Sequence, residues 1–371
     1  MSTTGTAGVA LAVGNTSQAT ADGSTAVGAD SSALGGGATA VGRAARALFS
    51  AGTSLGNNAF SAATGAVAIG ADTISQGTAS IAIGGDLDGN GSGAHTSAVG
   101  GIALGADSSV TFGSLGGISL GASATVTNTA GIAVGYGAGA SGYGAIAIGG
   151  DIGIDLVGAR AASLQSVAIG AESSVTSDAI GGTAIGALAT VSNVAGVALG
   201  NGAEASGVYS VALGAGSSAV GQNSVALGTN SEAPEENIVS VGSALVQRRV
   251  TNVAAGVNAT DAVNFGQLSA LQASQASLST SVDTLFDLRN RDRRDMKQGV
   301  ASAMAMAQAP MPSAPGKVAY AVNGATFRGE YAVGGSLQYR LNTEAPMAVN
   351  VGVSHAGGKN TGVRVGVAGE F

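Results

Sequence analysis

The chain has no cysteine and no tryptophan, and only 10% of its 371 residues are charged. Without cysteine it forms no disulfide bond, which fits a cell surface stabilised by assembly as well as a cytosol. Aromatic residues make up 4% of the chain, too few to fill a conventional globular core. No run of about 18 or more apolar residues occurs, which excludes a transmembrane helix. The opening MSTTGTAG has no charged or apolar leader region, so we expect no signal peptide in this chain.

Glycine and small apolar residues dominate the composition of the chain. There are 63 glycines against 5 prolines, and 45% of the residues are hydrophobic. The glycines do not follow a G-X-Y period, which excludes collagen. Such a chain can bury only small side chains, in thin and regular layers.

Charge divides the chain near Arg248. The preceding residues include three basic residues, Arg43, Arg46 and Arg160, and 14 acidic ones, a net charge of −11. From Arg248 onward 12 basic and 8 acidic residues give +4. Because binding to nucleic acid needs clustered Lys and Arg, we expect no nucleic-acid partner for the acidic part.

A short unit, x-[ATS]-[VIL]-G, repeats through the acidic part. Its glycines lie fourteen residues apart in three blocks: Gly14, Gly28, Gly42, Gly56, Gly70 and Gly84; then Gly121, Gly135 and Gly149; then Gly186, Gly200, Gly214, Gly228 and Gly242. Internal repeats of short strands and turns are typical of solenoids, in which stacked coils bury what one coil cannot.

Alternation within SVALG predicts a strand, with Val211 and Leu213 on one side and Ala212 on the other. A second short strand is expected at Ser218–Gly221, so that each unit forms one coil of a β-solenoid. We place the larger side chains of this stretch in the core and its glycines in the turns: Val211, Leu213, Val225 and Leu227 as buried residues, Gly214 and Gly228 as turns.

Two insertions, at 84–95 and 149–161, interrupt the repeat and predict loops from the same face of the stack. The first contains Asp86-Leu87-Asp88-Gly89-Asn90, which partly matches a calcium-binding loop. An EF-hand needs Glu at its twelfth position, which is Ser97 here. We therefore favour a solvated loop over a calcium site.

A heptad pattern follows the repeats. Apolar positions three and four residues apart are typical of a coiled coil, although an amphipathic core helix gives the same pattern: Leu268, Leu271, Gln275, Leu278, Val282 and Leu285. When the heptad pattern is continued to Met306, its later positions carry small or flexible side chains. This predicts that the end of the helix packs inside a narrow space. The helix is expected to end near Pro310–Pro312.

The last 55 residues predict four strands, at 317–328, 331–341, 347–354 and 361–371. Large apolar residues such as Val351 and Val365, and the terminal Phe371, alternate with small or polar ones. This pattern is typical of outer-membrane strands, and a soluble sheet with one wet face shows it too. The predicted inward side carries small residues: Gly334, Ser336, Gly352, Gly362, Gly366 and Ala368.

Four strands cannot close a barrel, and an open sheet edge is not viable in lipid. Two chains would supply 8 strands and three would supply about 12, and a lumen that holds helices needs the wider barrel. The strand count therefore favours a trimer.

The chain resembles the YadA-like trimeric autotransporter adhesins over nearly its whole length. VTNVAAGVNATDAVNFGQL at 250–268 resembles the family's neck, and GVASAMAMAQAPMPSAPGK at 299–317 the start of its membrane anchor. The resemblance implies a mainly β protein with four parts: a left-handed parallel β-roll head at 1–239 with insertions near 85–99 and 150–165, a neck at 240–268, a short trimeric coiled-coil stalk at 269–298, and an anchor at 299–371 that forms a 12-stranded transmembrane barrel as a trimer.

The function implied by this resemblance is adhesion from the bacterial surface. The homotrimer would sit in outer-membrane lipid with the help of the barrel-assembly machinery, and its head would bind host matrix proteins, host cells or other bacteria. The anchor would act as the translocation pore for the rest of the chain. Bulky substitutions at the small inward residues, such as Gly334→Trp, are then expected to slow export.

No enzymatic site is predicted. The two histidines, His95 and His355, are far apart in the sequence, and acidic residues are scattered singly at turns. We expect no catalytic residue, no cofactor and no metal site, although a β-solenoid polysaccharide lyase is a rival interpretation. A surface or biofilm scaffold without a specific ligand is another. The sequence identifies no ligand-binding residue.

Overall fold

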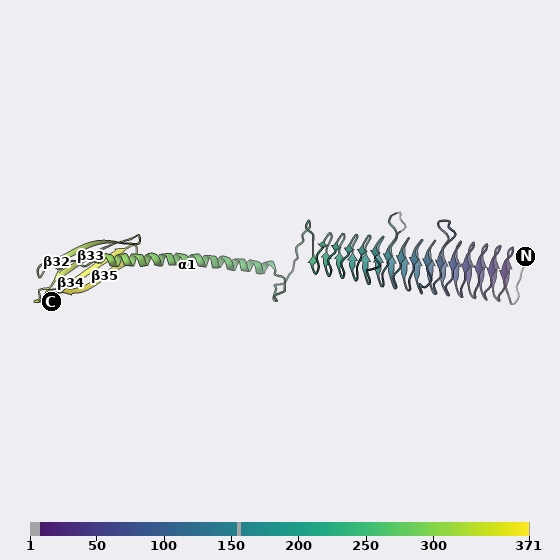
Figure 1. Ribbon diagram of the computed structural model, residues 1–371, viewed down its shortest axis with the longest axis horizontal. Helices are drawn as coiled ribbons and strands as arrows, with labels where there is room; N and C mark the ends of the chain where they lie inside the picture. The colour runs from purple at the N-terminus through teal and green to yellow at the C-terminus, as the bar shows by residue number, and fades with distance from the viewer. Residues whose placement is uncertain (1–7, 154–156, 371) are drawn as a thin grey trace. The chain divides into compact units, whose positions relative to one another are not determined.

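The computed structural model of the protein describes residues 8–153 and 157–370. The chain divides into two compact units, Met1–Arg249 and Val250–Phe371 (Figure 1). Phe371 and part of the second insertion, 154–156, lie outside the described residues, and the prediction for the Phe371 side chain lies there too. The finer division into head, neck, stalk and anchor stays a prediction.

The first unit is a parallel β-solenoid with two sheets, of 16 and 15 strands. The strands of the 16-stranded sheet are β1 (Leu11–Val13), β3 (Thr25–Val27), β5 (Thr39–Val41), β7 (Thr53–Leu55), β9 (Val67–Ile69), β11 (Ile81–Ile83), β13 (Ile102–Leu104), β15 (Ile118–Leu120), β17 (Ile132–Val134), β19 (Ile146–Ile148), β21 (Val167–Ile169), β23 (Thr183–Ile185), β25 (Val197–Leu199), β27 (Val211–Leu213), β29 (Val225–Leu227) and β31 (Val239–Ser240). Those of the 15-stranded sheet are β2 (Gln18–Ala19), β4 (Ser32–Ala33), β6 (Arg46–Ala47), β8 (Phe60–Ser61), β10 (Ile74–Ser75), β12 (His95–Thr96), β14 (Ser109–Val110), β16 (Thr125–Val126), β18 (Gly139–Ala140), β20 (Arg160–Ala161), β22 (Ser174–Val175), β24 (Thr190–Val191), β26 (Glu204–Ala205), β28 (Ser218–Ala219) and β30 (Glu232–Ala233).

The repeat places identical backbone positions of successive coils side by side. Val211 pairs with Val225, and Ser218 with Glu232, in parallel register. The repeated glycine ends the first strand of each coil, as at Gly214, where φ is 135°. A side chain at Gly214 would also overlap the backbone of Gly228 in the next coil. The glycine period thus follows from a turn that is strained for other residues and tightly stacked.

The core of the solenoid is made of alanine and serine, so our placement of the larger residues was wrong. Ala212 is fully buried, while Leu213 is 38% exposed and Val211 is half-buried. Val225 and Leu227 likewise flank the buried Ala226. The interior between the two sheets is too thin for large side chains at the centre of the longer strands, because each coil consists of strands of only three and two residues joined by tight turns.

Four valines are the exception, and glycines make room for them. Val126 is fully buried, and a Cβ atom added at Gly117 or Gly131 would lie 2.9 or 2.8 Å from its Cγ1 atom. The same holds for Val191 between Gly182 and Gly196. Larger side chains on one strand are therefore compensated by the loss of a side chain opposite them, which keeps the core filled without strain.

Arg248 closes the C-terminal end of the stack. Its guanidinium group donates hydrogen bonds to the Ser231 hydroxyl at 3.0 Å and to the carbonyl oxygens of Val241 and Thr229 at 2.8 and 2.5 Å. Carbonyl groups of a last coil have no further coil to pair with, so a multidentate donor satisfies them. The charge boundary seen in the sequence therefore begins with a residue that caps the solenoid.

The second unit begins with an irregular segment that is bound to the first turn of helix α1 (Phe265–Ala305). Asn264 and Gln267 form a capping box, and Gln267 also exchanges two hydrogen bonds with the backbone of Gly256, at 2.9 and 3.1 Å. The helix runs without a break past residue 298 and ends at Ala305, before Pro310. Among the described residues, no helix combines the length and apolar character needed to cross a membrane.

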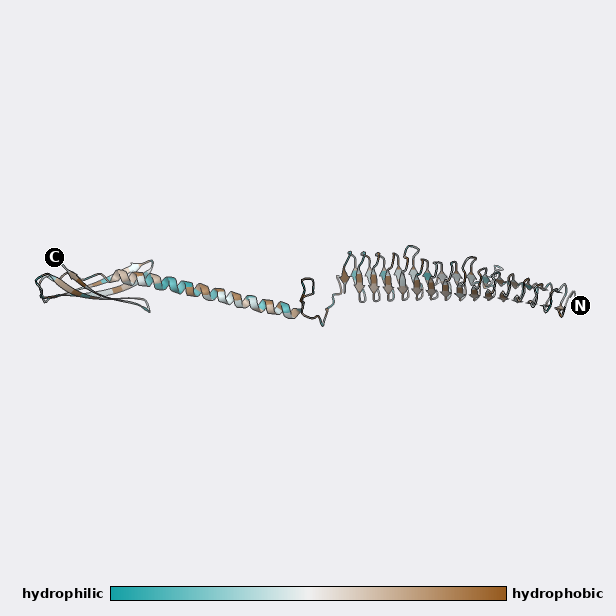
Figure 2. Cartoon of the chain, turned by 90° about the horizontal axis from the view of Figure 1, so that it is seen from below, coloured by the Kyte–Doolittle hydropathy of each residue, from teal (hydrophilic) through white to brown (hydrophobic). Residues whose placement is uncertain are grey.

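Four antiparallel strands follow as a meander: β32 (Val318–Phe327), β33 (Glu330–Arg340), β34 (Met347–Ala356) and β35 (Asn360–Gly369). Their bounds lie close to those predicted. One face packs against the end of α1, where Ala301 and Ala305 are fully buried. The other face presents large apolar side chains, among them Val322, Leu337 and Val365, which are exposed. Figure 2 shows hydrophobic strands in both units and a hydrophilic stretch in α1.

Candidate functional site

The most extensive candidate surface is the outer face of the 16-stranded sheet. Each coil presents the first and third residues of its strand there, as Val211 and Leu213 do in β27. Leu199, Leu213 and Leu227 lie on consecutive coils and are 41, 38 and 42% exposed. A continuous apolar row of this kind is suited to burial against another surface.

The second candidate surface is the inner face of the four-stranded sheet, which the end of α1 covers. The hydroxyl groups of Ser302 and Ser354 are 2.6 Å apart, and Ser336 donates a 2.8 Å hydrogen bond to the carbonyl oxygen of Ala307. Gln308 donates to Gln338 at 3.0 Å. These hydroxyl and amide groups are thus satisfied between the sheet and residues 302–308.

At the end of this interface, Gln298 binds both hairpin turns. Its Nε2 donates to the Glu330 carboxylate at 2.9 Å, and its Oε1 accepts from Asn360 at 3.0 Å. One glutamine thereby links α1 to the β32–β33 and β34–β35 hairpins.

The predicted inward residues all lie on the helix-facing side of the sheet, where they accommodate the helix. A Cβ atom at Gly334 would overlap the Ala305 carbonyl oxygen, and one at Gly362 would overlap the end of the Met306 side chain. Gly352 lies beside Ser336, and Gly366 beside Asn350. Ala368 pairs with Ala348. Small size at Gly334 and Gly362 therefore allows close approach of the end of α1 and of Met306.

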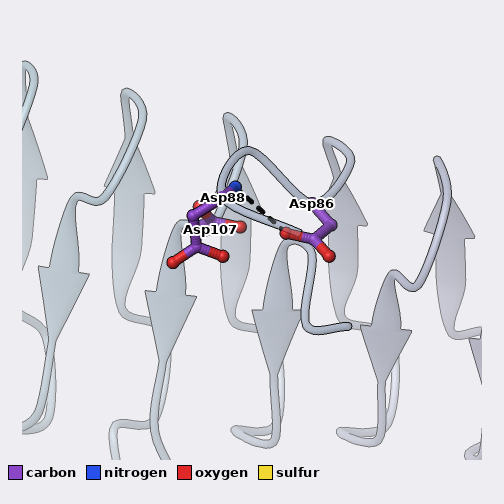
Figure 3. Close-up of side chains that lie close together, drawn as sticks. All are labelled: Asp86, Asp88 and Asp107. Carbon is purple, nitrogen blue, oxygen red and sulfur yellow. Dashed lines mark hydrogen bonds between the residues drawn. The ribbon is translucent and has the colours of Figure 1, made fainter. Parts of the chain in front are cut away.

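In the structure, a third carboxylate lies beside Asp86 and Asp88, the two aspartates that the sequence analysis considered as calcium ligands. Ligand oxygens of Asp86, Asp88 and Asp107 all lie within 4.8 Å of one another, on the first insertion and the turn after β13 (Figure 3). Sequence reasoning missed Asp107, because the insertion breaks the fourteen-residue spacing that would have aligned the turns. Ser97, the twelfth EF-hand position, follows β12 and donates its N–H to Val110, so it belongs to the stack.

Backbone N–H groups already occupy the Asp86 carboxylate. Its oxygens accept hydrogen bonds from Gly91 at 2.6 Å, Gly89 at 2.7 Å and Asp88 at 3.1 Å. The bond from Gly91 is the largest of the influences that lower the pKa of Asp86. The carboxylate therefore organises its own loop, as a solvated turn would require.

The two histidines lie in different units. His95 is half-buried on β12, and desolvation lowers its pKa. His355 on β34 shares a 2.8 Å hydrogen bond with the Thr361 hydroxyl through Nδ1. Each belongs to the surface of its own sheet.

Three family models match separate parts of the chain. The YadA head domain repeat matches residues 10–31, 127–151 and 205–231. The coiled stalk of trimeric autotransporter adhesins matches 249–287, and the YadA-like membrane anchor domain matches 310–371. These are structural and binding modules without enzymatic activity, which confirms that the chain is not an enzyme.

Individual relatives agree with the family models. The chain is 35% identical over 88 residues to the autotransporter adhesin EhaG of Escherichia coli O157:H7, a match that covers 23% of this chain and 5% of EhaG. Among solved structures, the collagen-binding domain of the Yersinia adhesin YadA is 28% identical and has a TM-score of 0.36. That comparison covers 52% of this chain and 97% of the YadA domain.

Proposed function

We propose that this chain, which belongs to the YadA-like trimeric autotransporter adhesins, forms a homotrimer that attaches the bacterial surface to host matrix, host cells or other bacteria. The observation that carries this proposal is the half-exposed apolar row on the 16-stranded sheet. Three heads that face one axis would bury this row in every coil, which supplies the driving force for assembly.

The four-stranded sheet supports the same stoichiometry. β32 and β35 are its edge strands, each paired on one side within a chain. Edge strands in lipid need partners, and twelve strands from three chains would close a barrel with the three ends of α1 inside. The exposed apolar face would then meet outer-membrane lipid. We propose that this barrel, assembled with the barrel-assembly machinery, also serves as the pore through which the head leaves the cell.

Two similar proteins guide the choice of the first ligand to test. EhaG is an adhesin, and the YadA domain is described as collagen-binding. We propose host matrix as the first ligand to test. A trimer presents each surface three times, and many trimers share one cell, so weak contacts suffice when avidity raises affinity by about 10²–10⁴.

Adhesion is tested by producing the full chain behind a secretory signal peptide in a bacterial strain without adhesins. We expect an SDS-resistant trimer band in unboiled membrane samples, and saturable binding of the cells to immobilised collagen, fibronectin or laminin. The control is the same strain producing the chain without residues 8–249 of the head. A monomer band from correctly inserted protein would contradict the trimer, and non-saturable sticking to every surface would indicate a scaffold without a ligand.

A further inference from the structure

The outer face of the 15-stranded sheet changes character near its N-terminal end. In most coils its outward residues are small or polar, as at Ser109, Thr125, Gly139, Ser174, Thr190 and Ser218. In the coils between 32 and 75 five of them are large, beside the small Ser32 and Ala62. We name the group of Leu34, Arg46, Leu48, Phe60 and Ile74 the Arg46 patch.

Strand register brings these residues together. Arg46, Phe60 and Ile74 pair directly on adjacent strands β6, β8 and β10. Leu34 and Leu48 lie beside them in consecutive coils, because the N–H of Leu34 bonds to Ala47 and that of Leu48 to Ser61. Leu34 is 39% exposed and Arg46 is exposed, while Leu48, Phe60 and Ile74 are half-buried, so the patch lies on the surface with part of its apolar area covered.

The fold does not need large residues here. The same positions in most other coils hold small or polar residues, with Arg160 and Val220 as larger ones, and the core beneath the patch consists of fully buried Ala33, Ala47, Ser61 and Ser75. The patch also lies on the sheet opposite the apolar row that we assign to the trimer interface. Large apolar residues that neither fill the core nor continue that interface are suited to an external partner.

Charge narrows the kind of partner. Arg46 is one of three basic residues among the first 247, against 14 acidic ones. Its guanidinium carbon lies 5.0 Å from the centre of the Phe60 ring, so the ring holds the side chain over the patch. The guanidinium N–H groups are suited to a carboxylate, with apolar surface on both sides. A sulfated glycan would need clustered basic residues, and this patch holds only Arg46.

We propose that the Arg46 patch binds an extended polypeptide segment in which a carboxylate side chain lies between apolar ones. This inference rests on the proposed adhesive function and names the chemistry of one ligand. The patch extends over four coils, about 14 Å at roughly 4.8 Å per step, which matches four or five residues of extended chain. A segment that runs along the stack places its carboxylate at Arg46 and its apolar side chains on Leu34 and Phe60, in the coils on either side.

The test uses the full-chain trimer in detergent and labelled peptides of about ten residues, long enough to cover the patch. We compare an alternating Glu/Leu peptide with Lys/Leu and Glu/Ser peptides of the same length. The Glu/Leu peptide is expected to bind, and Arg46→Glu or Phe60→Ser to weaken it on the order of tenfold. Arg46→Lys keeps the charge but not the planar donor group, and should lose part of the affinity.

Arg160→Glu is the matched control. Arg160 has the same strand position on β20, but its neighbours are Gly139 and Ser174 in place of large side chains. Its replacement should change the affinity by less than about twofold. Each variant is checked for an unchanged melting temperature, so that loss of binding is not loss of fold.

Three results would overturn the proposal: no binding of the Glu/Leu peptide, equal binding of the Lys/Leu peptide, or equal effects of Arg46→Glu and Arg160→Glu. Heparin binding that is lost with Arg46→Glu would assign the patch to a glycan instead, and concentration-dependent self-association to a second copy. Whole-cell adhesion separates the two proposals. If Arg46→Glu cells bind matrix as wild-type cells do, the patch proposal fails; if wild-type cells do not bind, the adhesive function fails.

Discussion

The hydroxyl groups of Ser302 on α1 and Ser354 on β34 lie 2.6 Å apart, within one hydrogen bond. Both residues are almost fully buried, and they join segments more than fifty positions apart in the chain. A single buried hydroxyl pair fixes the rotation of the helix on the sheet, because any other rotation would leave both groups unsatisfied. The small residues around this pair are therefore under a strict steric limit.

Gly334→Ala is expected to weaken the anchor. The added methyl group would overlap the carbonyl oxygen of Ala305, and overpacking costs about 1–3 kcal/mol. Gly335→Ala on the same strand is the control, because a methyl group there lies 3.8 Å from its nearest neighbour. The measurement is the temperature at which the trimer dissociates on SDS gels. Equal temperatures for the two variants would contradict this packing, as would normal surface display of the head after Gly334→Trp.

Ala212→Leu tests which side of β27 is inside. Ala212 is fully buried between Ala198 and Ala226, so a larger side chain should destabilise the solenoid by about 1–3 kcal/mol. Leu213→Ser should leave each coil folded and weaken the trimer. Denaturant unfolding followed by circular dichroism, together with unboiled gels, distinguishes the two effects. The reverse pattern, an unfolded Leu213→Ser and a silent Ala212→Leu, would restore the discarded assignment of the core.

Acid should destabilise the first unit through His95. Burial lowers the pKa of His95 below its usual value near 6.5, so the unfolded chain takes up this proton at a higher pH than the folded one. The contribution of neutral His95 is therefore complete above about pH 6.5 and is lost progressively as the pH falls towards the lowered pKa. Above neutral pH, the melting temperatures of wild type and His95→Gln should change with pH in parallel. Below about pH 6, the melting temperature of the wild type should fall more steeply than that of His95→Gln. Parallel curves throughout would exclude this effect.

The Asp86 loop should be insensitive to metal. Because Gly91, Gly89 and Asp88 already donate to its carboxylate, we expect Asp86→Ala to open the loop to protease while EDTA and added calcium leave its cleavage unchanged. Limited proteolysis of the full chain measures this. Calcium-dependent protection that disappears in Asp107→Asn would show instead that the three carboxylates bind an ion.

Periodicity predicted much of this fold from the sequence. Glycines fourteen residues apart fixed the coil length, and alternation in residues 317–371 located all four strands of the second unit. Alternation also separated Val211 from Ala212, but a period of two is symmetric and does not say which side is inside. Coil thickness decides that question, and thickness is the distance between the two sheets within one coil, which alternation does not specify.

Surface features were harder to predict, because they depend on register between coils. Arg46 and Phe60 are fourteen residues apart and become neighbours only when the coils stack. Asp107 joins Asp86 across an insertion, where counting residues fails. The contact of Gly334 with Ala305 depends on where α1 ends against the sheet, which heptad spacing does not specify.

Hydrogen bonds in the solenoid run along its axis, from one coil to the next, as between the Val211 N–H and the Ser224 carbonyl at 2.9 Å. A pulling force along that axis stretches these bonds directly and loads every coil boundary with the same force. Since each coil contacts only its neighbours, tension would peel coils from an end in short, equal steps. A cell attached through such a stack could absorb mechanical work by reversible lengthening, coil by coil, before the attachment itself had to break.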